Sequence, residues 1–448
     1  MAMQHPHFLK MAAFGVLALA TTACASATDD SALVETDAPV ASADSELVSP
    51  APTRVEPADS VADTAAAIAE ATTTTTTSTT TTTTTTTTTI ATTTTVPLPT
   101  AAECAAEIPL EVRVGQLMFP LITQPDFAAA AEAAERGLIG GVVVIGNPTA
   151  AIAGDIAAMQ NRSLLGPLIV AVDEEGGTVQ RLAGITSTLP SARTAASSLT
   201  TAEAQELARA HAVAIGELGF TMNLAPVVDL DNGGFLESRT FSSDPSIATD
   251  YGFATADGIL EAGLSPVIKH FPGHGRGTDS HTGLPTLPEL SVLEGDDLIP
   301  FARAAERGDL PIMIGHLVVP DLTNGKPATL SPEAINGLLR DQLGFDGLVM
   351  TDAFNMAAIA ATTSNAEAAE QSLAAGVDLV MLGSLGATEG TVDHVLAAID
   401  AGVITEQSIT ESFLRVLDNR GLEICALPED LRPSIGCEVV GDSCISGG

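Results

Sequence analysis

Short apolar segments alternate with Ala-rich helical stretches between about residues 105 and 422, and this alternation restricts the possible folds more than any other feature. Eight of these segments have the length and composition of strands: 115–121, 141–147, 168–173, 221–230, 264–270, 311–316, 347–352 and 378–383. Apolar runs without polar alternation indicate strands that are buried on both faces, as in a parallel sheet. The stretches between them predict amphipathic helices at 126–137, 149–162, 202–219, 246–262, 332–343 and 365–375.

Eight β/α units in about 320 residues predict an α/β fold, a single (β/α)8 TIM-type barrel over residues 104–424. A doubly wound open sheet is the alternative. The barrel is favoured because polar residues follow the ends of the strands, and a barrel brings these ends to one mouth. The polar residues at these positions are Asn147, Asp173, Asp229, Lys269, His270, His316 and Asp352.

The chain before the barrel has a different composition. Residues 1–27 have a mildly basic start, a short apolar run and then small residues, which predicts a secretory signal peptide. Cleavage after Ala25 or Ala27 fits this pattern, and so does lipidation of Cys24, because small residues precede it as in a bacterial lipobox. Residues 28–103 are acidic and then Thr-rich, so they predict a disordered linker. We therefore expect an exported monomer, either lipid-anchored in the cell envelope or secreted.

Four cysteines lie at the two ends of the predicted barrel, one at its first residue and three in the C-terminal tail 425–448: Cys104, Cys425, Cys437 and Cys444. An even number in an exported chain suggests disulfides. Pairing Cys104 with Cys425 and Cys437 with Cys444 is one pattern that fits, although the sequence does not fix the connectivity.

The chain is strongly acidic, with 56 acidic and 18 basic side chains and a formal net charge of −38. This charge argues against a nucleic-acid partner, because phosphate contacts require Lys and Arg. It also argues against adhesion to anionic lipid by surface charge.

The segment 269–281, KHFPGHGRGTDSH, contains the densest group of reactive side chains. His270, His274, Asp279 and His281 could gather around a metal ion, although Lys269 beside them disfavours a cation. The glycines could cradle a phosphate, but no Lys-Ser or Lys-Thr helix start follows them. The third interpretation is a catalytic loop in which the Asp279 carboxylate orients the His281 ring and favours its protonated form. Such a histidine can donate and retrieve a proton near neutral pH.

Five segments in this order resemble glycoside hydrolase family 3, in its single-domain β-N-acetylhexosaminidase branch. The specific one is KHFPGHG followed by DSH, and the others are VDEEGGTVQRL (172–182), NLAPVVDL (223–230), SRTFSSDP (238–245) and GLVMTDAFNM (347–356). The resemblance covers roughly residues 105–420.

The resemblance implies a retaining enzyme that forms a glycosyl-enzyme intermediate. Asp352, at the end of the seventh predicted strand, matches the nucleophile, and His281 with Asp279 matches the acid/base dyad. A carboxylate at a strand end that faces the mouth suits the same role. Five further residues match positions that hold the sugar: Asp173, Arg181, Arg239, Lys269 and His270.

The implied reaction is the removal of terminal GlcNAc from peptidoglycan fragments or related glycans, with water or phosphate as acceptor, and it requires no cofactor and no metal. A β-glucosidase or another exo-glycosidase on the same scaffold is one alternative. A glycan-binding lipoprotein without activity is another. One departure from many relatives lies directly after Asp352, where Ala353 and Phe354 replace a second acidic residue and Leu.

Several of these side chains also have structural interpretations. Asp173 and Lys269 can form an ion pair with each other, and Arg181 and Arg239 can form structural salt bridges. His316 either shapes the pocket or is a satisfied core histidine. Structural roles are also expected for His274, Asp229 and Asp378.

Overall fold

The computed structural model describes residues 99–427, 437–440 and 443–446. The predicted signal peptide, Cys24 and the predicted linker up to residue 98 lie outside the described residues. Helix α1 begins at Ala101, three residues before the start predicted for the barrel domain. A capping box between Thr100 and Glu103 starts this helix, since each residue accepts a hydrogen bond from the backbone N–H of the other.

The strands form two parallel sheets. The first sheet has the order β1 (Leu121–Ile122), β2 (Gly141–Val144), β3 (Ile169–Val172), β6 (Met222–Asn223) and β7 (Ser265–Pro266). The second has the order β10 (Val349–Thr351), β9 (Ile312–Ile314) and β8 (Ile268–Phe271). A short antiparallel ribbon joins β4 (Glu174–Gly176) to β5 (Val179–Gln180). The prediction of an α/β fold with parallel strands is confirmed.

Backbone hydrogen bonds also connect the edges of the two sheets. Phe119 N–H donates to the Val380 carbonyl at 3.0 Å, and Leu379 N–H donates to the Val349 carbonyl at 3.1 Å. The segment around Val380 therefore lies between the β1 edge and the β10 edge. On the other side, Val227 makes a parallel bridge to Lys269, and β7 continues into β8.

Several strands are shorter than predicted. Helix α2 (Leu110–Gly115) takes the start of the predicted strand 115–121. Only Met222–Asn223 of the predicted strand 221–230 forms β6, and Pro226 has no N–H to extend its ladder. In the predicted strand 378–383, Leu379 and Val380 form isolated bridges only.

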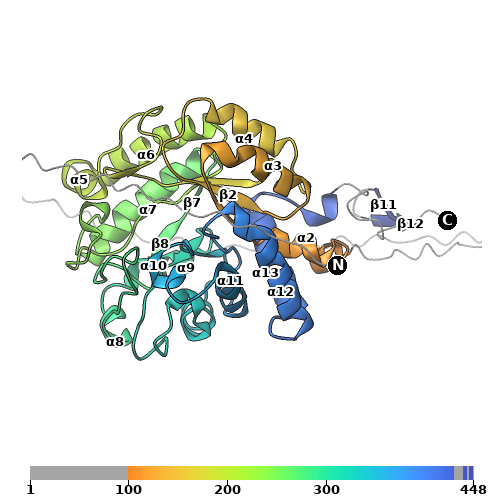
Figure 1. Ribbon diagram of the computed structural model, residues 1–448. Coiled ribbons are helices and arrows are strands. Elements are labelled where there is room, and N and C mark those ends of the chain that lie inside the picture. The colour runs from red at the N-terminus through yellow and green to blue at the C-terminus, as the bar shows by residue number, and fades with distance from the viewer. Residues whose placement is uncertain (1–98, 428–436, 441–442, 447–448) are drawn as a thin grey trace, which may run out of the picture. The chain divides into compact units, whose positions relative to one another are not determined.

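Helices cover the outside of the strands (Figure 1). The longer ones are α3 (Phe127–Glu135), α4 (Ile152–Gln160), α6 (Thr201–Glu217), α7 (Pro245–Glu261), α9 (Ile299–Arg307), η4 (Glu333–Gln342), α11 (Asn365–Ala374), α12 (Thr388–Asp400) and α13 (Glu406–Asn419). The shorter ones are α5 (Ala192–Ser198), α8 (Leu290–Leu293), α10 (Ala357–Ala360), η1 (Gln124–Asp126), η2 (Glu237–Arg239), η3 (Ala328–Leu330), η5 (Leu385–Ala387) and η6 (Ile424–Ala426). Each of the six predicted helical stretches matches one of the longer helices, although α6 and α7 begin one residue earlier than predicted. Within the described residues, none of these helices is long and apolar enough to cross a membrane.

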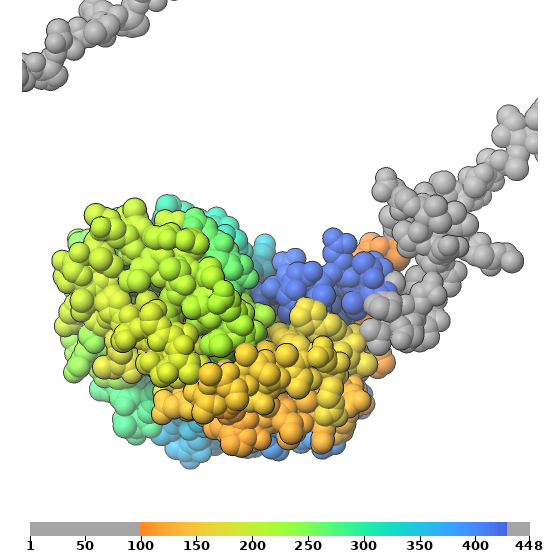
Figure 2. Space-filling model, turned by 90° about the horizontal axis from the view of Figure 1, so that it is seen from above, coloured from red at the N-terminus to blue at the C-terminus, as the bar shows by residue number. Residues whose placement is uncertain are grey.

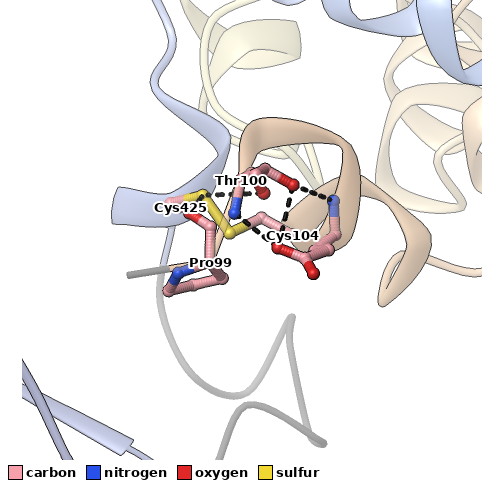
Figure 3. The surroundings of a disulfide bond; sticks show 5 residues. Pro99, Thr100, Cys104 and Cys425 are labelled. Carbon is pink, nitrogen blue, oxygen red and sulfur yellow. Dashed lines mark hydrogen bonds between the residues drawn. A yellow bond between two sulfur atoms is a disulfide. The ribbon is translucent and has the colours of Figure 1, made fainter. Parts of the chain in front are cut away.

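The first and last helices of the described body lie side by side. Helix α1 contacts α13 and η6, and a disulfide joins Cys104 to Cys425 across 321 residues of sequence (Figure 3). Figure 2 shows the same neighbourhood of early, orange segments and late, blue segments. The predicted Cys104–Cys425 pair is confirmed.

The described part of the tail forms an antiparallel ribbon of β11 (Cys437–Val440) and β12 (Ser443–Ser446). Cys437 and Cys444 lie in these two strands, and the disulfide between them stays a prediction.

The end of α13 is fixed to the segments that precede two of the strands. The Arg420 guanidinium donates to the Pro167 carbonyl at 2.6 Å, to the Leu165 carbonyl at 3.0 Å and to the Gln116 side chain at 2.6 Å. Because these acceptors precede β3 and β1, the chain enters and leaves the body at the amino ends of the strands.

Candidate active site

A cavity of about 410 Å³ lies at the carboxyl ends of the strands, a volume within the range of small-molecule sites. All the predicted catalytic and sugar-binding residues line it except Asp279: Asp173, Arg181, Arg239, Lys269, His270, His281 and Asp352. They come from segments that are far apart in sequence, and the parallel strands bring these segments to one end.

Asp352 follows β10 directly and is half-buried at the cavity wall. Its Oδ1 accepts a hydrogen bond from the Ala353 N–H at 2.8 Å, and its backbone N–H donates to the Ile314 carbonyl of β9 at 3.0 Å. Burial opposes its negative charge, but nearby His270 and His316 more than offset this effect and hold the pKa of Asp352 below its ordinary value. The side chain is therefore an ionised carboxylate at neutral pH, with one oxygen that makes no hydrogen bond to any described residue.

His281 lies on the exposed loop after β8, with its ring bound to Asp279. The distance from His281 Nδ1 to Asp279 Oδ1 is 2.9 Å, and the His281 N–H donates to the same oxygen at 2.9 Å. Burial opposes the charge on Asp279, but the two hydrogen bonds from His281 lower the pKa of this carboxyl. The Asp279–His281 pair predicted from the sequence is therefore present, and it presents His281 to the cavity.

His316 stabilises the turn that carries Asp352 by a hydrogen bond to the next residue, Ala353. This ring is fully buried, donates from Nε2 to the Ala353 carbonyl at 3.0 Å and accepts the Thr329 hydroxyl hydrogen bond at Nδ1 at 2.9 Å. Burial holds the pKa of His316 below its ordinary value. The Phe354 ring stacks on it with a centroid distance of 6.2 Å. Of the two interpretations for His316, the satisfied core histidine fits.

A chain of alternating charges forms one wall of the cavity. Lys269 Nζ lies 2.8 Å from Asp173 and 2.6 Å from Glu175, and Arg239 donates two hydrogen bonds to Glu175 at 2.7 and 2.9 Å. Burial opposes the charge on Glu175, but Lys269 and Arg239 together lower its pKa to about 2. Burial alone would lower the pKa values of Lys269 and Arg239, whereas their carboxylate partners raise them above the ordinary values. These ion pairs and hydrogen bonds hold Asp173, Glu175, Lys269 and Arg239 in place along the wall.

The ion-pair interpretation therefore holds for Asp173 with Lys269, and Arg239 also has a carboxylate partner, but both pairs line the cavity. Glu175 was missed by the sequence analysis. Its position in the DEEGG segment, two residues after Asp173, was the available signal.

Arg181 differs from the other cavity cations. Its guanidinium makes no ion pair to any described residue, and its buried Nε has no hydrogen-bond partner there. The structural salt bridge proposed as its alternative role is absent from the part of the chain described. An unpaired guanidinium at a cavity wall can donate to the oxygen atoms of a ligand.

The His-rich segment does not assemble a metal site. His270 Nδ1 faces Asp229 at 2.7 Å, His274 Nε2 faces the Ser280 hydroxyl at 3.2 Å and His281 faces Asp279. Residues 99–427 contain no group of three or more side chains arranged to hold a metal ion. Nor does the loop run directly into a helix that would complete a phosphate cradle, since the next helix is α8 at Leu290.

Comparison with known proteins places this geometry in a family. The glycosyl hydrolase family 3 N-terminal domain matches residues 109–418. Beta-hexosaminidase LpqI of Mycobacterium tuberculosis is 41% identical over 266 residues, which are 57% of this chain and 68% of the relative.

Solved structures agree with this match. The structure of LpqI from M. tuberculosis has a TM-score of 0.68 and 36% identity, covering 72% of this chain and 97% of that one. A beta-N-acetylhexosaminidase from Beutenbergia cavernae has a TM-score of 0.65 and 29% identity, covering 70% and 99%. The resemblance seen in the sequence is confirmed.

Proposed function

The chain belongs to glycoside hydrolase family 3, and from this premise we propose that it is a retaining exo-β-N-acetylglucosaminidase. The enzyme is a glycoside hydrolase of the β-hexosaminidase type. Its substrate is a terminal β-linked GlcNAc on a peptidoglycan fragment or a related glycan. The protein works as an exported monomer, held in the cell envelope by a lipid at Cys24 or released by cleavage of the signal peptide.

The observation that carries the proposal is the shared cavity of Asp352 and His281. An ionised carboxylate and a separate proton donor at one sugar site are the two groups that retention requires. In the first step, an Asp352 oxygen forms a bond to the anomeric carbon while protonated His281 gives its proton to the glycosidic oxygen. The bond to the leaving group breaks, and the product is a glycosyl-enzyme with neutral His281.

In the second step, neutral His281 takes a proton from water, and the water oxygen displaces Asp352 from the anomeric carbon. Phosphate is a second candidate acceptor, because a neutral imidazole repels an anion less than a carboxylate base would. The Asp279 carboxylate orients the ring in both steps and stabilises its charge.

Sugar binding falls to the charged wall and to Arg181. Asp173, Lys269 and His270 offer acceptors and donors for hydroxyl groups, and Arg239 is held in place by Glu175. Charge-assisted hydrogen bonds of this kind are stronger than neutral ones. The fold that presents these groups is a closed (β/α)8 barrel, and the hydrogen bonds at both sheet edges support this interpretation.

A β-glucosidase or another exo-glycosidase is the alternative on the same scaffold. Paired assays with chromogenic GlcNAc and glucose substrates separate these activities. If wild-type protein and Asp352→Ala show the same background turnover while sugar still binds, the chain is a glycan-binding protein.

The direct test of mechanism is mass spectrometry after incubation with a fluorinated GlcNAc-type inactivator that traps the glycosyl-enzyme. We expect one label, on the peptide that contains Asp352. A label on any other peptide would refute the assignment of the nucleophile.

A further inference from the structure

We propose that Asp229 is a positioning residue that holds the His270 ring with its Nε2 directed to the sugar. The inference rests on the proposed function, since it assigns a role to a residue behind the same cavity. Asp229 itself does not line the cavity, and we expect it to act on the substrate only through His270.

Asp229 accepts three hydrogen bonds from the segment that follows β8. Its Oδ2 accepts from the His270 N–H at 3.0 Å and from the His270 Nδ1–H at 2.7 Å. Its Oδ1 accepts from the His274 N–H at 2.6 Å. The Asp229 residue is 1% exposed, so these contacts are shielded from water. Both the backbone and the ring of His270 are therefore fixed by one carboxylate.

This contact determines which nitrogen of the His270 ring is directed to the cavity. A carboxylate on Nδ1 keeps the proton on that nitrogen, which leaves Nε2 as the outer atom of the ring. His270 lines the cavity, and its Nε2 makes no hydrogen bond to any described residue. The ring cannot rotate to another partner without losing Asp229. The charged and titratable groups that surround it are Asp229, Lys269, His274, His316 and Asp352.

A second buried carboxylate shows what a purely structural role looks like in this protein. Asp378 is fully buried and pairs with Arg340 and Arg415, at 2.7 and 3.0 Å. Asp229 makes no ion pair with Arg or Lys in residues 99–427, and its partner is a ring whose other nitrogen faces the cavity. The two sites have similar burial and different partners, so Asp378 is the matched control.

The test is a double-mutant cycle with Asp229→Asn, His270→Ala and the double variant, measured by kcat and KM on a chromogenic GlcNAc substrate. Asn at this position can donate to Nδ1, which moves the proton to Nε2. We expect Asp229→Asn to lower kcat/KM about 10- to 100-fold, the range for a residue that orients a site histidine. In the His270→Ala background, the same change should lower it by less than about threefold. The division of the loss between kcat and KM should match that of His270→Ala.

Asp378→Asn should keep kcat/KM within about threefold of wild type while its melting temperature falls. The proposal is overturned if Asp229→Asn and His270→Ala multiply their effects, or if Asp229→Asn alone changes kcat/KM by less than about threefold.

A measurement on the wild-type protein avoids any loss of folding in the variants. With 15N-labelled histidine, nuclear magnetic resonance should report His270 protonated on Nδ1, and addition of GlcNAc should shift its Nε2 signal. A ring protonated on Nε2 alone, or an Nε2 signal unchanged by saturating GlcNAc, contradicts the proposal. If wild-type protein neither cleaves the substrate nor binds GlcNAc, the proposed function fails. If wild-type protein is active and the Asp229→Asn substitution leaves its kcat/KM unchanged, only this inference is refuted.

Discussion

The amino ends and the carboxyl ends of the strands use the same types of charged side chain to different effect. At the amino ends, Asp378 receives hydrogen bonds from Arg340, Arg415, Ser412 and the Val349 N–H, so both of its oxygens are occupied. At the carboxyl ends, Lys269 and Arg239 are just as firmly paired with carboxylates, but the arrangement leaves selected atoms free.

Among the described residues that line the cavity, Arg181 (Nε), His270 (Nε2), His281 (Nε2) and Asp352 (one carboxylate oxygen) each have such a free atom. Asp229, Asp279 and Ala353 hold His270, His281 and Asp352 in place through hydrogen bonds. Paired charges therefore stabilise both ends of the strands. Chemistry is expected only at the end where side-chain atoms without a hydrogen-bond partner face the cavity. Changes at the two ends should therefore separate activity from stability.

The largest expected effect is at Asp352. Without the nucleophile no glycosyl-enzyme forms, so Asp352→Ala should lower kcat about 10⁴-fold or more, as removal of a catalytic nucleophile does. Its melting temperature should stay within a few degrees of wild type, because this carboxylate forms no ion pair with an Arg or Lys among the described residues. Steady-state kinetics beside thermal unfolding checks both parts, and unfolding of the variant at room temperature would break the comparison.

A smaller effect is expected at His281. Loss of the proton donor should lower kcat for His281→Ala about 10²- to 10⁴-fold on substrates with poor leaving groups. The loss should shrink for a dinitrophenyl leaving group, which departs without a proton. Rates for a series of aryl GlcNAc substrates test this, and an equal loss on every leaving group would assign His281 to binding instead.

The disulfide at the amino ends should affect stability and not activity. Cys104→Ser with Cys425→Ser removes a link across 321 residues, which we expect to lower the free energy of unfolding by about 2–5 kcal/mol. The kcat/KM should remain within twofold, because the cavity lies at the opposite ends of the strands. Denaturant titration and kinetics at 25 °C measure the two quantities, and a parallel loss of activity would mean that the two ends are coupled.

The smallest effect concerns pH and Glu175. Its pKa is about 2 in the folded protein and near 4.5 when unfolded, so the stability it contributes is complete above about pH 4.5 and is lost as the pH falls toward 2. Glu175→Gln should lower stability at pH 7 and flatten its pH dependence between pH 4.5 and 2. Thermal unfolding across this range tests the prediction, and an unchanged acid slope in the variant would contradict it.

Local sequence patterns were sufficient for much of the molecule. The apolar segments located the parallel strands, and the amphipathic stretches located the helices, because both depend on burial with a fixed period. Motif spacing also placed Asp279 two residues from His281, close enough to pair without knowledge of the fold.

Other features needed contacts that spacing does not encode. Pro226, and the extension of α2 to Gly115, shortened two predicted strands through local geometry. Glu175 was overlooked because its importance comes from Lys269 and Arg239, which are distant in sequence. Asp229 was assigned a structural role, and only its contact with His270 suggests another one.

The sequence by itself determined the alternation of strands and helices, the family, and which side chains carry the chemistry, since each of these is written in local composition and order. The tertiary structure alone decided which charges cancel one another and which atoms are left to face the cavity. Pairing of charges depends on distances of a few ångströms between segments up to a few hundred residues apart, and those distances exist only once the chain has folded.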